Sequence, residues 1–288
     1  MLQVARLSPR LLGDSAGLVV DFLRGQLNDD GGFKNRSGES DLYYSVFGIE
    51  GMLALRAELP AAKIAAYLGT FGGGASLDLV HASCLLRCWA ALPPEARRDA
   101  PRAEVLRRVA QFRSADGAYA TEPGAERGTL YGCFMAAGSY QDARAELPDP
   151  GAVVRCIRRL RAADGGYAND DNLPVGLTPP SAAAATLLRN LGESVPAELA
   201  DWLLARHHKE GGFFATPLAP IPDLLSTATA LHALSGMQVS LEPVKEPCVD
   251  FVDSLWTNRG AFYGNWTEDV ADCEYTYYGL LALGHLSL

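Results

Sequence analysis

A short glycine-rich phrase occurs six times in this sequence, with 41, 45, 48, 46 and 49 residues between successive first glycines. Each copy lies between two apolar stretches that have helical spacing. A period of this length is typical of architectures in which one supersecondary unit is stacked several times. The predicted unit is therefore a helix, a glycine-rich turn and a second helix. The six copies are Asp30-Gly31-Gly32-Phe33, Phe71-Gly72-Gly73-Gly74, Asp116-Gly117-Ala118-Tyr119, Asp164-Gly165-Gly166-Tyr167, Glu210-Gly211-Gly212-Phe213 and Arg259-Gly260-Ala261-Phe262.

The helices on the two sides of each phrase differ in character. Before the phrase, polar residues interrupt an apolar stripe, as Asp21 does between Leu18 and Phe22, which indicates one buried and one solvated face. After the phrase, the runs are apolar all round, which is typical of buried helices. Further helices of the first kind are expected at 61–70, 103–113, 151–161, 197–207 and 247–256. Helices of the second kind are expected at 42–56, 79–91, 129–137, 181–191, 224–235 and 273–287.

The strict alternation of six polar-faced and six buried helices favours two concentric layers. The buried helices would form an inner ring, and the polar-faced helices would surround it. An open solenoid usually carries polar capping repeats at its ends, whereas this sequence ends on the apolar run Leu286-Ser287-Leu288. We therefore expect an all-α fold, a closed α/α ring of six helical hairpins that spans residues 1–288 as a single domain.

Composition and charge exclude several classes of function. The net charge of −9 argues against a nucleic-acid partner, because phosphate binding needs a basic surface. The six cysteines form no CxxC pair, which indicates reduced thiols in an intracellular protein. No stretch reaches the ~20 apolar residues that span a membrane, and residues 1–14 lack the apolar run of a signal peptide. We expect a soluble, cytoplasmic protein without a membrane span.

A second recurring phrase marks the positions where the buried helices begin. Four of these helices directly follow an aspartate, and each aspartate is a good N-cap, a structural role worth ~1 kcal/mol. In a closed ring these helix N-termini all point to one mouth of a central cavity, so the four carboxylates would line one rim. Crowded carboxylates raise one another's pKa, and one of them could then stay protonated and act as an acid. The four residues are Asp41, Asp78, Asp223 and Asp272.

Aromatic and basic residues accompany the aspartates. Tyr44, His81 and Tyr275 each lie three residues after an aspartate, on about the same helix face and one turn deeper. The tyrosines equally suit core packing, because aromatic side chains also fill helical bundles. The functional interpretation is an apolar, aromatic cavity with an ionisable lip. Further aromatic residues expected on the inner helices are Phe47, Tyr131, Tyr277 and Tyr278.

The repeated unit resembles that of the β subunits of protein prenyltransferases and of the squalene and oxidosqualene cyclases. The resemblance rests on the pattern of outer helix, Asp-Gly-Gly-Phe phrase and inner helix, and it covers nearly the whole chain. It implies an α/α toroid of six hairpins. The repeat phrase is much less specific for an activity than for this fold, so the functional motifs are compared position by position.

The zinc motif of the prenyltransferases is incomplete in this sequence. In that family a DxC phrase in the fifth repeat and the histidine of a DxxHT phrase in the last repeat bind one catalytic zinc. Here the corresponding positions hold Asp223, Leu225 and Tyr275, so one of three expected ligands is present, whereas a catalytic zinc needs three. The loop at 215–222 also lacks the family's diphosphate-binding arginine and lysine. We expect no tightly bound stoichiometric zinc, and the cofactor stays unassigned between zinc, magnesium and none.

The first repeat resembles the family's zinc repeat more closely than the fifth does. Lys34 and Arg36 precede Asp41 as in a GGFxGR…DxCYS phrase, Tyr43 takes the place of the cysteine, and the next repeat supplies His81. A site displaced around the ring would use Lys34 and Arg36 as anion anchors. Asp41 and His81 would be its partial metal ligands.

The other branches of the superfamily match less well. Squalene-type cyclases use a DxDD or DxDC acid motif, and the run Asp269-Val-Ala-Asp272-Cys273 has the wrong spacing for it. Those cyclases usually contain two toroid-type domains, and this chain has room for one. The Cys/Cys/His zinc set of LanC-like cyclases is not found. Arg127 matches a DxRFS or DxRYS phrase of the prenyltransferases, in which the arginine faces the cavity, although Ala125 replaces the leading aspartate.

Three functions follow as hypotheses. The first is a prenyltransferase-β-like protein that binds an isoprenoid or similar apolar chain and transfers a prenyl group, with an α-type subunit as a candidate partner. The second is a non-catalytic toroid that serves as a binding or interaction module, and the third is a small class-II-like terpene cyclase that uses a rim aspartate as its acid. The candidate catalytic residues are Asp41, Asp78, His81, Asp272 and Tyr275. The candidate substrate-binding residues are Lys34, Arg36, Tyr44, Arg127 and Asp223.

Overall fold

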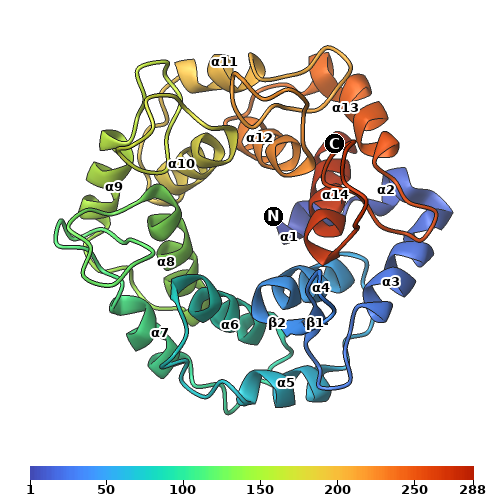
Figure 1. The fold of residues 1–288 in the computed structure, drawn as a ribbon, viewed down its shortest axis with the longest axis vertical. Helices are drawn as coiled ribbons and strands as arrows, with labels where there is room; N and C mark the ends of the chain where they lie inside the picture. Colours follow the sequence, from blue (N-terminus) through green and yellow to red (C-terminus); the bar gives the residue numbers. More distant parts are fainter.

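The computed structural model describes residues 1–288 and contains two concentric layers of helices (Figure 1). The inner layer follows the expected apolar runs closely. Its helices are α4 (Leu42–Ala54), α6 (Leu79–Ala91), α8 (Leu130–Ala143), α10 (Thr178–Asn190), α12 (Leu224–Gly236) and α14 (Cys273–Leu286). The outer helices are α3 (Ala16–Gly25), α5 (Ala61–Gly69), α7 (Arg102–Ala110), α9 (Pro150–Arg159), α11 (Glu198–Leu204) and α13 (Glu242–Ser254).

The inner ring is closed. Each inner helix contacts the next one along the chain, and α14 contacts both α12 and α4, so the last repeat packs directly against the first. Most residues of α12 and α14 are buried, as expected for helices that are apolar all round. The predicted α/α toroid of six hairpins is therefore confirmed.

The glycine phrase joins an outer helix to the following inner helix. In five repeats its last residue is a buried aromatic side chain, paired in an isolated bridge to a residue two or three positions after the end of the outer helix. In three repeats the backbone N–H of this aromatic residue donates to a hydroxyl on the inner helix. The donor–acceptor distances are 3.0 Å from Phe33 to Ser45, 2.8 Å from Tyr167 to Ser181 and 2.9 Å from Phe213 to Thr227. This bond attaches the turn to the start of the inner helix.

The first glycine of the phrase allows the turn to touch the next outer helix. Gly211 has φ of +98°, and a Cβ built on it would lie 1.9 Å from the carbonyl oxygen of Pro247 in α13. Gly260 of the last phrase has φ of +82° and makes the same kind of contact with Leu18 of α3, at 2.1 Å. Only glycine tolerates both the backbone conformation and the close approach. The Gly260 contact closes the outer ring.

Short elements complete the fold. The phrase of the first repeat is extended into a two-stranded antiparallel sheet of β1 (Phe33–Lys34) and β2 (Ser40–Asp41), in which Phe33 pairs with Asp41. The chain begins with α1 (Leu2–Ala5), α2 (Pro9–Leu12) and the 3₁₀ helix η1 (Gly13–Ser15). In Figure 1 the N-terminus and α1 lie inside the ring, where α1 contacts α14 and α4.

Two helices differ most from the expected ranges. The inner helix expected at 129–137 continues to Ala143 in α8, where the Ser139 hydroxyl is bonded inside the ring, 2.8 Å from both Met135 O and Ser83 Oγ. The helix expected at 247–256 begins earlier, at Glu242. Pro247 therefore lies inside it, close enough to its start to remove only one early hydrogen bond.

We expect Ser181→Ala to lower the free energy of unfolding by about 1–3 kcal/mol, because it leaves the buried N–H of Tyr167 without an acceptor. Ser235→Ala, at the end of α12, is the matched control and should change this free energy by less than about 0.5 kcal/mol. Denaturant unfolding followed by circular dichroism measures both variants. Equal effects would contradict a structural role for the bond between turn and inner helix.

Candidate functional site

The four rim aspartates all cap inner helices. The carboxylate of Asp41 accepts from the backbone N–H groups of Tyr43 and Tyr44, at 2.7 and 3.2 Å. Asp78, Asp223 and Asp272 each accept from the N–H three residues later, at 2.8, 2.7 and 2.9 Å. The caps orient all four carboxylates toward the same end of the ring.

His81 joins the first two repeats at this rim. Its Nδ1 lies 2.8 Å from an Asp78 oxygen, and its Nε2 lies 3.6 Å from an Asp41 oxygen. The interaction with Asp41, more than that with Asp78, raises the pKa of His81 to about 9. In turn, His81 lowers the pKa of Asp41, and although burial opposes it, hydrogen bonds from His81 lower the pKa of Asp78. The predicted effect of crowding does not apply to Asp41 and Asp78, because a cation lies between these two carboxylates.

Arg36 joins the first and last repeats in a similar way. Its Nε donates to Asp272 at 2.9 Å, a second guanidinium nitrogen lies 3.2 Å from Glu268, and the guanidinium carbon is 5.6 Å from the centre of the Tyr275 ring. Tyr44 lies close to this group, and burial together with the charge of Asp272 raises the pKa of its hydroxyl. The guanidinium of Arg36 is thus already compensated by two carboxylates.

A different carboxyl group lies between α4 and α14. The hydroxyl of Tyr43 donates to Glu274 at 2.5 Å. Burial raises the pKa of Glu274 to about 7, although the hydrogen bond from Tyr43 acts in the opposite direction. The ring of Phe47 is 5.0 Å from that of Tyr43 and 5.5 Å from that of Tyr278, so the carboxyl group adjoins an aromatic wall. A carboxyl group with this pKa can donate or accept a proton near neutral pH.

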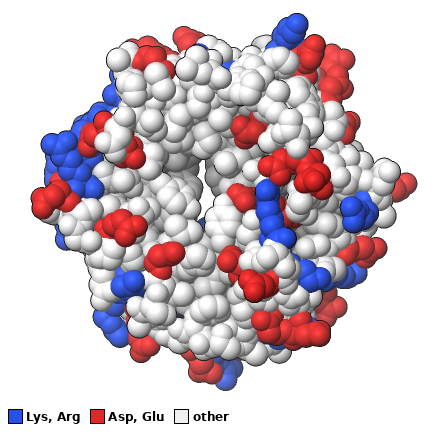
Figure 2. Space-filling model, in the orientation of Figure 1, with Lys and Arg blue, Asp and Glu red and all other residues white.

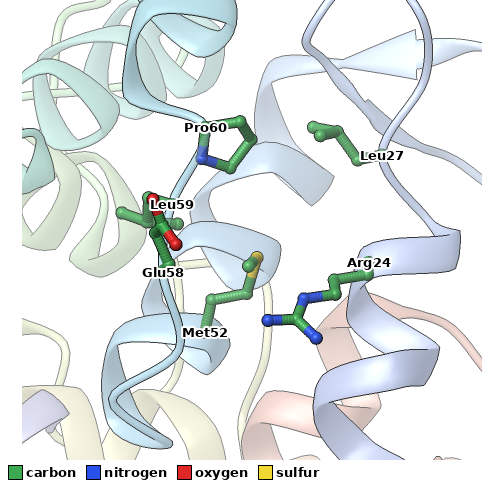
Figure 3. Close-up of a pocket in the computed structure, with 6 residues that line it drawn as sticks. All are labelled: Arg24, Leu27, Met52, Glu58, Leu59 and Pro60. Atoms are coloured by element: carbon green, nitrogen blue, oxygen red, sulfur yellow. The ribbon is translucent and has the colours of Figure 1, made fainter.

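The centre of the ring is open on one face. Figure 2 shows a hollow inside the inner layer, with acidic side chains gathered beside it over α14 and α4. A separate surface pocket of about 280 Å³ lies between α3 and the segment that follows α4, and it contains no predicted site residue (Figure 3). Its lining residues are Arg24, Leu27, Met52, Glu58, Leu59 and Pro60. No residue of the Glu274 group lines this pocket.

Comparison with known families agrees with this architecture. The family model described as "Prenyltransferase alpha-alpha toroid domain" matches residues 62–213 and 180–287, which together cover more than half of the chain. The chain belongs to the prenyltransferase alpha-alpha toroid family. No curated protein matches it.

Solved structures share the toroid fold at low sequence identity. The type II terpene cyclase MstE from Scytonema, in complex with geranylgeranyl dihydroxybenzoate, has a TM-score of 0.65 and 13% identity, and 97% of each chain is covered. A protein from Actinoplanes has a TM-score of 0.61 and 17% identity over 94% of this chain and 97% of its own. Candida albicans protein geranylgeranyltransferase-I, complexed with GGPP, has a TM-score of 0.54 and 14% identity over 99% of this chain and 81% of its own.

The residues of this toroid do not fit the zinc site that the prenyltransferase branch implies. No three side chains of His, Cys, Asp or Glu are grouped so that they could hold a metal ion. Asp223 is bonded to Ser226, and both ring nitrogens of His81 face carboxylates. Burial raises the pKa of the nearby Cys84 thiol, so the thiolate that binds zinc is disfavoured there. We derive no metal-dependent step.

Three of the predicted substrate-binding residues lie apart from the two rim clusters. Lys34 Nζ donates to the carbonyl of Gly25 at the end of the outer helix α3, so it terminates that helix instead of anchoring an anion. Arg127 is exposed and lies 3.4 Å from Asp171, which also pairs with the outer-helix residue Arg159, so the expected cavity position of Arg127 is wrong. Asp223 bonds only within its own helix start, and burial raises its pKa.

The remaining predicted residues are brought together across repeats six, one and two. They are Arg36, Asp41, Tyr44, Asp78, His81, Asp272 and Tyr275. Sequence reasoning did not single out Glu274 or assign Tyr43 a partner. Their positions in the sequence could have indicated them, because Tyr43 and Glu274 each lie two residues after a capping aspartate, as the cysteine does in the family's DxC phrase.

The structure contains no helix long and apolar enough to cross a membrane.

The His81 group predicts a pH-dependent contribution to stability. Because the pKa of His81 rises from 6.5 to about 9 on folding, its stabilising effect is fully present below 6.5 and is lost as the pH rises through about 9. We expect His81→Gln to lower the melting temperature clearly at pH 6 and by much less at pH 10. Thermal scans of both proteins across this range test it, and a difference that stays constant with pH would disprove the ion pairing.

Proposed function

We propose that this toroid binds an isoprenoid or similar apolar chain in its central hollow and acts on it as a proton donor, in the manner of a small class-II-like terpene cyclase. The observation that supports the proposal is Glu274, a half-buried carboxyl group with a pKa of about 7 beside the aromatic side chains of the inner ring. An apolar cavity with a few convergent polar groups and a perturbed carboxyl group is the usual form of a small-molecule site. The MstE complex contains a geranylgeranyl compound in the same fold.

The chemistry needs a protonated carboxyl group at the start of the reaction. Glu274 would give its proton to one carbon of a terminal alkene, and the resulting cation would be attacked by the next double bond of the chain. The final cation then loses a proton to the Glu274 carboxylate, which returns the catalyst to its starting state, so the product is an isomer of the substrate. The faces of Tyr43, Phe47 and Tyr278 are suited to the cationic stage, because aromatic rings attract positive charge.

The rim carboxylates are less suited to this step. Asp41 and Asp78 are held ionised by His81, and the carboxylate of Asp272 is paired with Arg36. These charges instead suit the entrance of the hollow. An apolar chain avoids charged groups, so it would bind in the interior and not at the entrance. Prenyl transfer from a diphosphate is the alternative, and it is disfavoured because Arg36 already faces two carboxylates and Lys34 bonds to a helix end.

We expect Glu274→Gln to reduce turnover by about 10²-fold or more, since the amide keeps the shape but cannot supply the proton. Binding of geranylgeraniol, measured by thermal shift, should persist in this variant. Glu193→Gln, in a surface pair with Arg158, is the control and should retain activity. Wild-type protein is incubated with farnesyl and geranylgeranyl alcohols and diphosphates, and products are identified by mass.

The product masses separate the hypotheses. An isomer of the substrate supports cyclisation, whereas a transferred prenyl group with released diphosphate supports the transferase. Binding without any product would leave the non-catalytic binding module. If no farnesyl or geranylgeranyl compound shifts the melting temperature at saturation, the proposal of a lipid-binding hollow is refuted.

The hydrogen bond from Tyr43 gives a further prediction. This bond lowers the pKa of Glu274, so Tyr43→Phe should raise that pKa and keep the carboxyl group protonated to higher pH. Wild-type activity should fall as the pH rises through about 7, and the descending limb should move to higher pH in Tyr43→Phe. An unchanged pH profile would rule out Glu274 as the proton donor.

A further inference from the structure

The N-terminal segment Met1–Ser8 lies at the end of the inner ring opposite the aspartate rim. Its helix α1 contacts α14 and α4, and Figure 1 places the N-terminus inside the ring. The contact on α14 is at Gly284, which is about 18 Å along the helix from the capping Asp272. The segment therefore extends from α14 and α4 into the ring, near the C-terminal ends of these helices.

The segment is packed tightly against this end of the ring. Ala5 and Ser8 are fully buried. A Cβ built on Gly284 would lie 2.2 Å from the carbonyl oxygen of Val4, closer than any side chain is tolerated. Met1, Leu2 and Val4 are partly buried and pack against the apolar core of the ring.

A cluster of charged side chains lies between the rim and this segment, closer to the segment. Arg87 on α6 donates to Glu50 on α4 at 2.5 Å and lies 3.2 Å from Asp142 on α8. Glu50 is only 4% exposed and is about 13 Å along α4 from Asp41. An apolar chain that reached this level would have to desolvate or separate three charged groups, which costs more than burying the chain gains.

We infer that Met1–Ser8, together with the Arg87–Glu50–Asp142 cluster, forms the closed floor of the hollow and sets the longest apolar chain that it accepts. The inference rests on the proposed function, because it concerns the same hollow. Along the inner helices the depth available between rim and floor is about 13 Å at Glu50 and about 18 Å at Gly284. Chains longer than this depth must fold back or displace the segment.

Gly284→Ala tests the floor in the full-length chain. The added methyl group must push Val4 away, which should deepen the hollow. Gly69→Ala, which has no atom within 4 Å of its new Cβ, is the matched control. The affinities of farnesol, geranylgeraniol and geranylfarnesol are measured by calorimetry for each protein. We expect affinity in the wild type to rise with chain length up to a limit, and the first alcohol beyond that limit to bind about tenfold tighter to Gly284→Ala only.

Hydrogen exchange of the wild-type protein gives an independent readout that does not require the variant to fold. An alcohol longer than the limit should speed exchange of the amides of residues 4–8, whereas a shorter one should leave it unchanged. If the wild type binds no alcohol, the proposed function fails. If the wild type binds alcohols with a length limit, two results would overturn the inference about the floor. One is an unchanged limit in folded Gly284→Ala, and the other is an exchange rate at residues 4–8 that does not depend on chain length.

Discussion

The architecture depends on the hydrogen bond that runs from the aromatic residue of the glycine turn to a hydroxyl near the start of the inner helix. In three repeats the acceptors are Ser45, Ser181 and Thr227, and each bond is buried. A buried N–H without an acceptor is costly, so the bond fixes where the turn ends and where the inner helix begins. Because this junction recurs, the inner helices point the same way, and their capping aspartates meet at one rim.

Two carboxyl groups at the start of α14 lie in different surroundings and therefore suit different chemical roles. Asp272 caps the helix and is paired with Arg36, whereas Glu274, two residues later, faces the hydroxyl of Tyr43. The first lies beside a cation, while burial raises the pKa of the second to about 7. One helical turn therefore carries a carboxylate paired with an arginine and a carboxyl group whose pKa is raised to about 7.

The fold was predictable from the sequence because the same pattern of helix, glycine-rich turn and helix recurs in all six repeats. The period, the alternation of polar-faced and buried helices and the apolar last run all pointed to a closed ring. The site was only partly predictable, because it depends on partners far apart in the sequence. Lys34 and Arg127 matched family phrases, yet each binds a nearby carbonyl or carboxylate. The pKa values of Asp41 and Asp78 depend on a histidine placed between them, and Glu274 gains its character from burial. The distances between side chains that set these pKa values cannot be read from the spacing of residues in the sequence.

The seam of the ring passes through the candidate site. The pairs Arg36–Asp272 and Tyr43–Glu274 each connect the first repeat to the last, and no covalent bond joins these two ends. During synthesis the first repeat therefore leaves the ribosome with one half of each pair missing, and its aromatic wall stays open until α14 has been made. A chain that stopped before α14 would therefore lack both of these contacts.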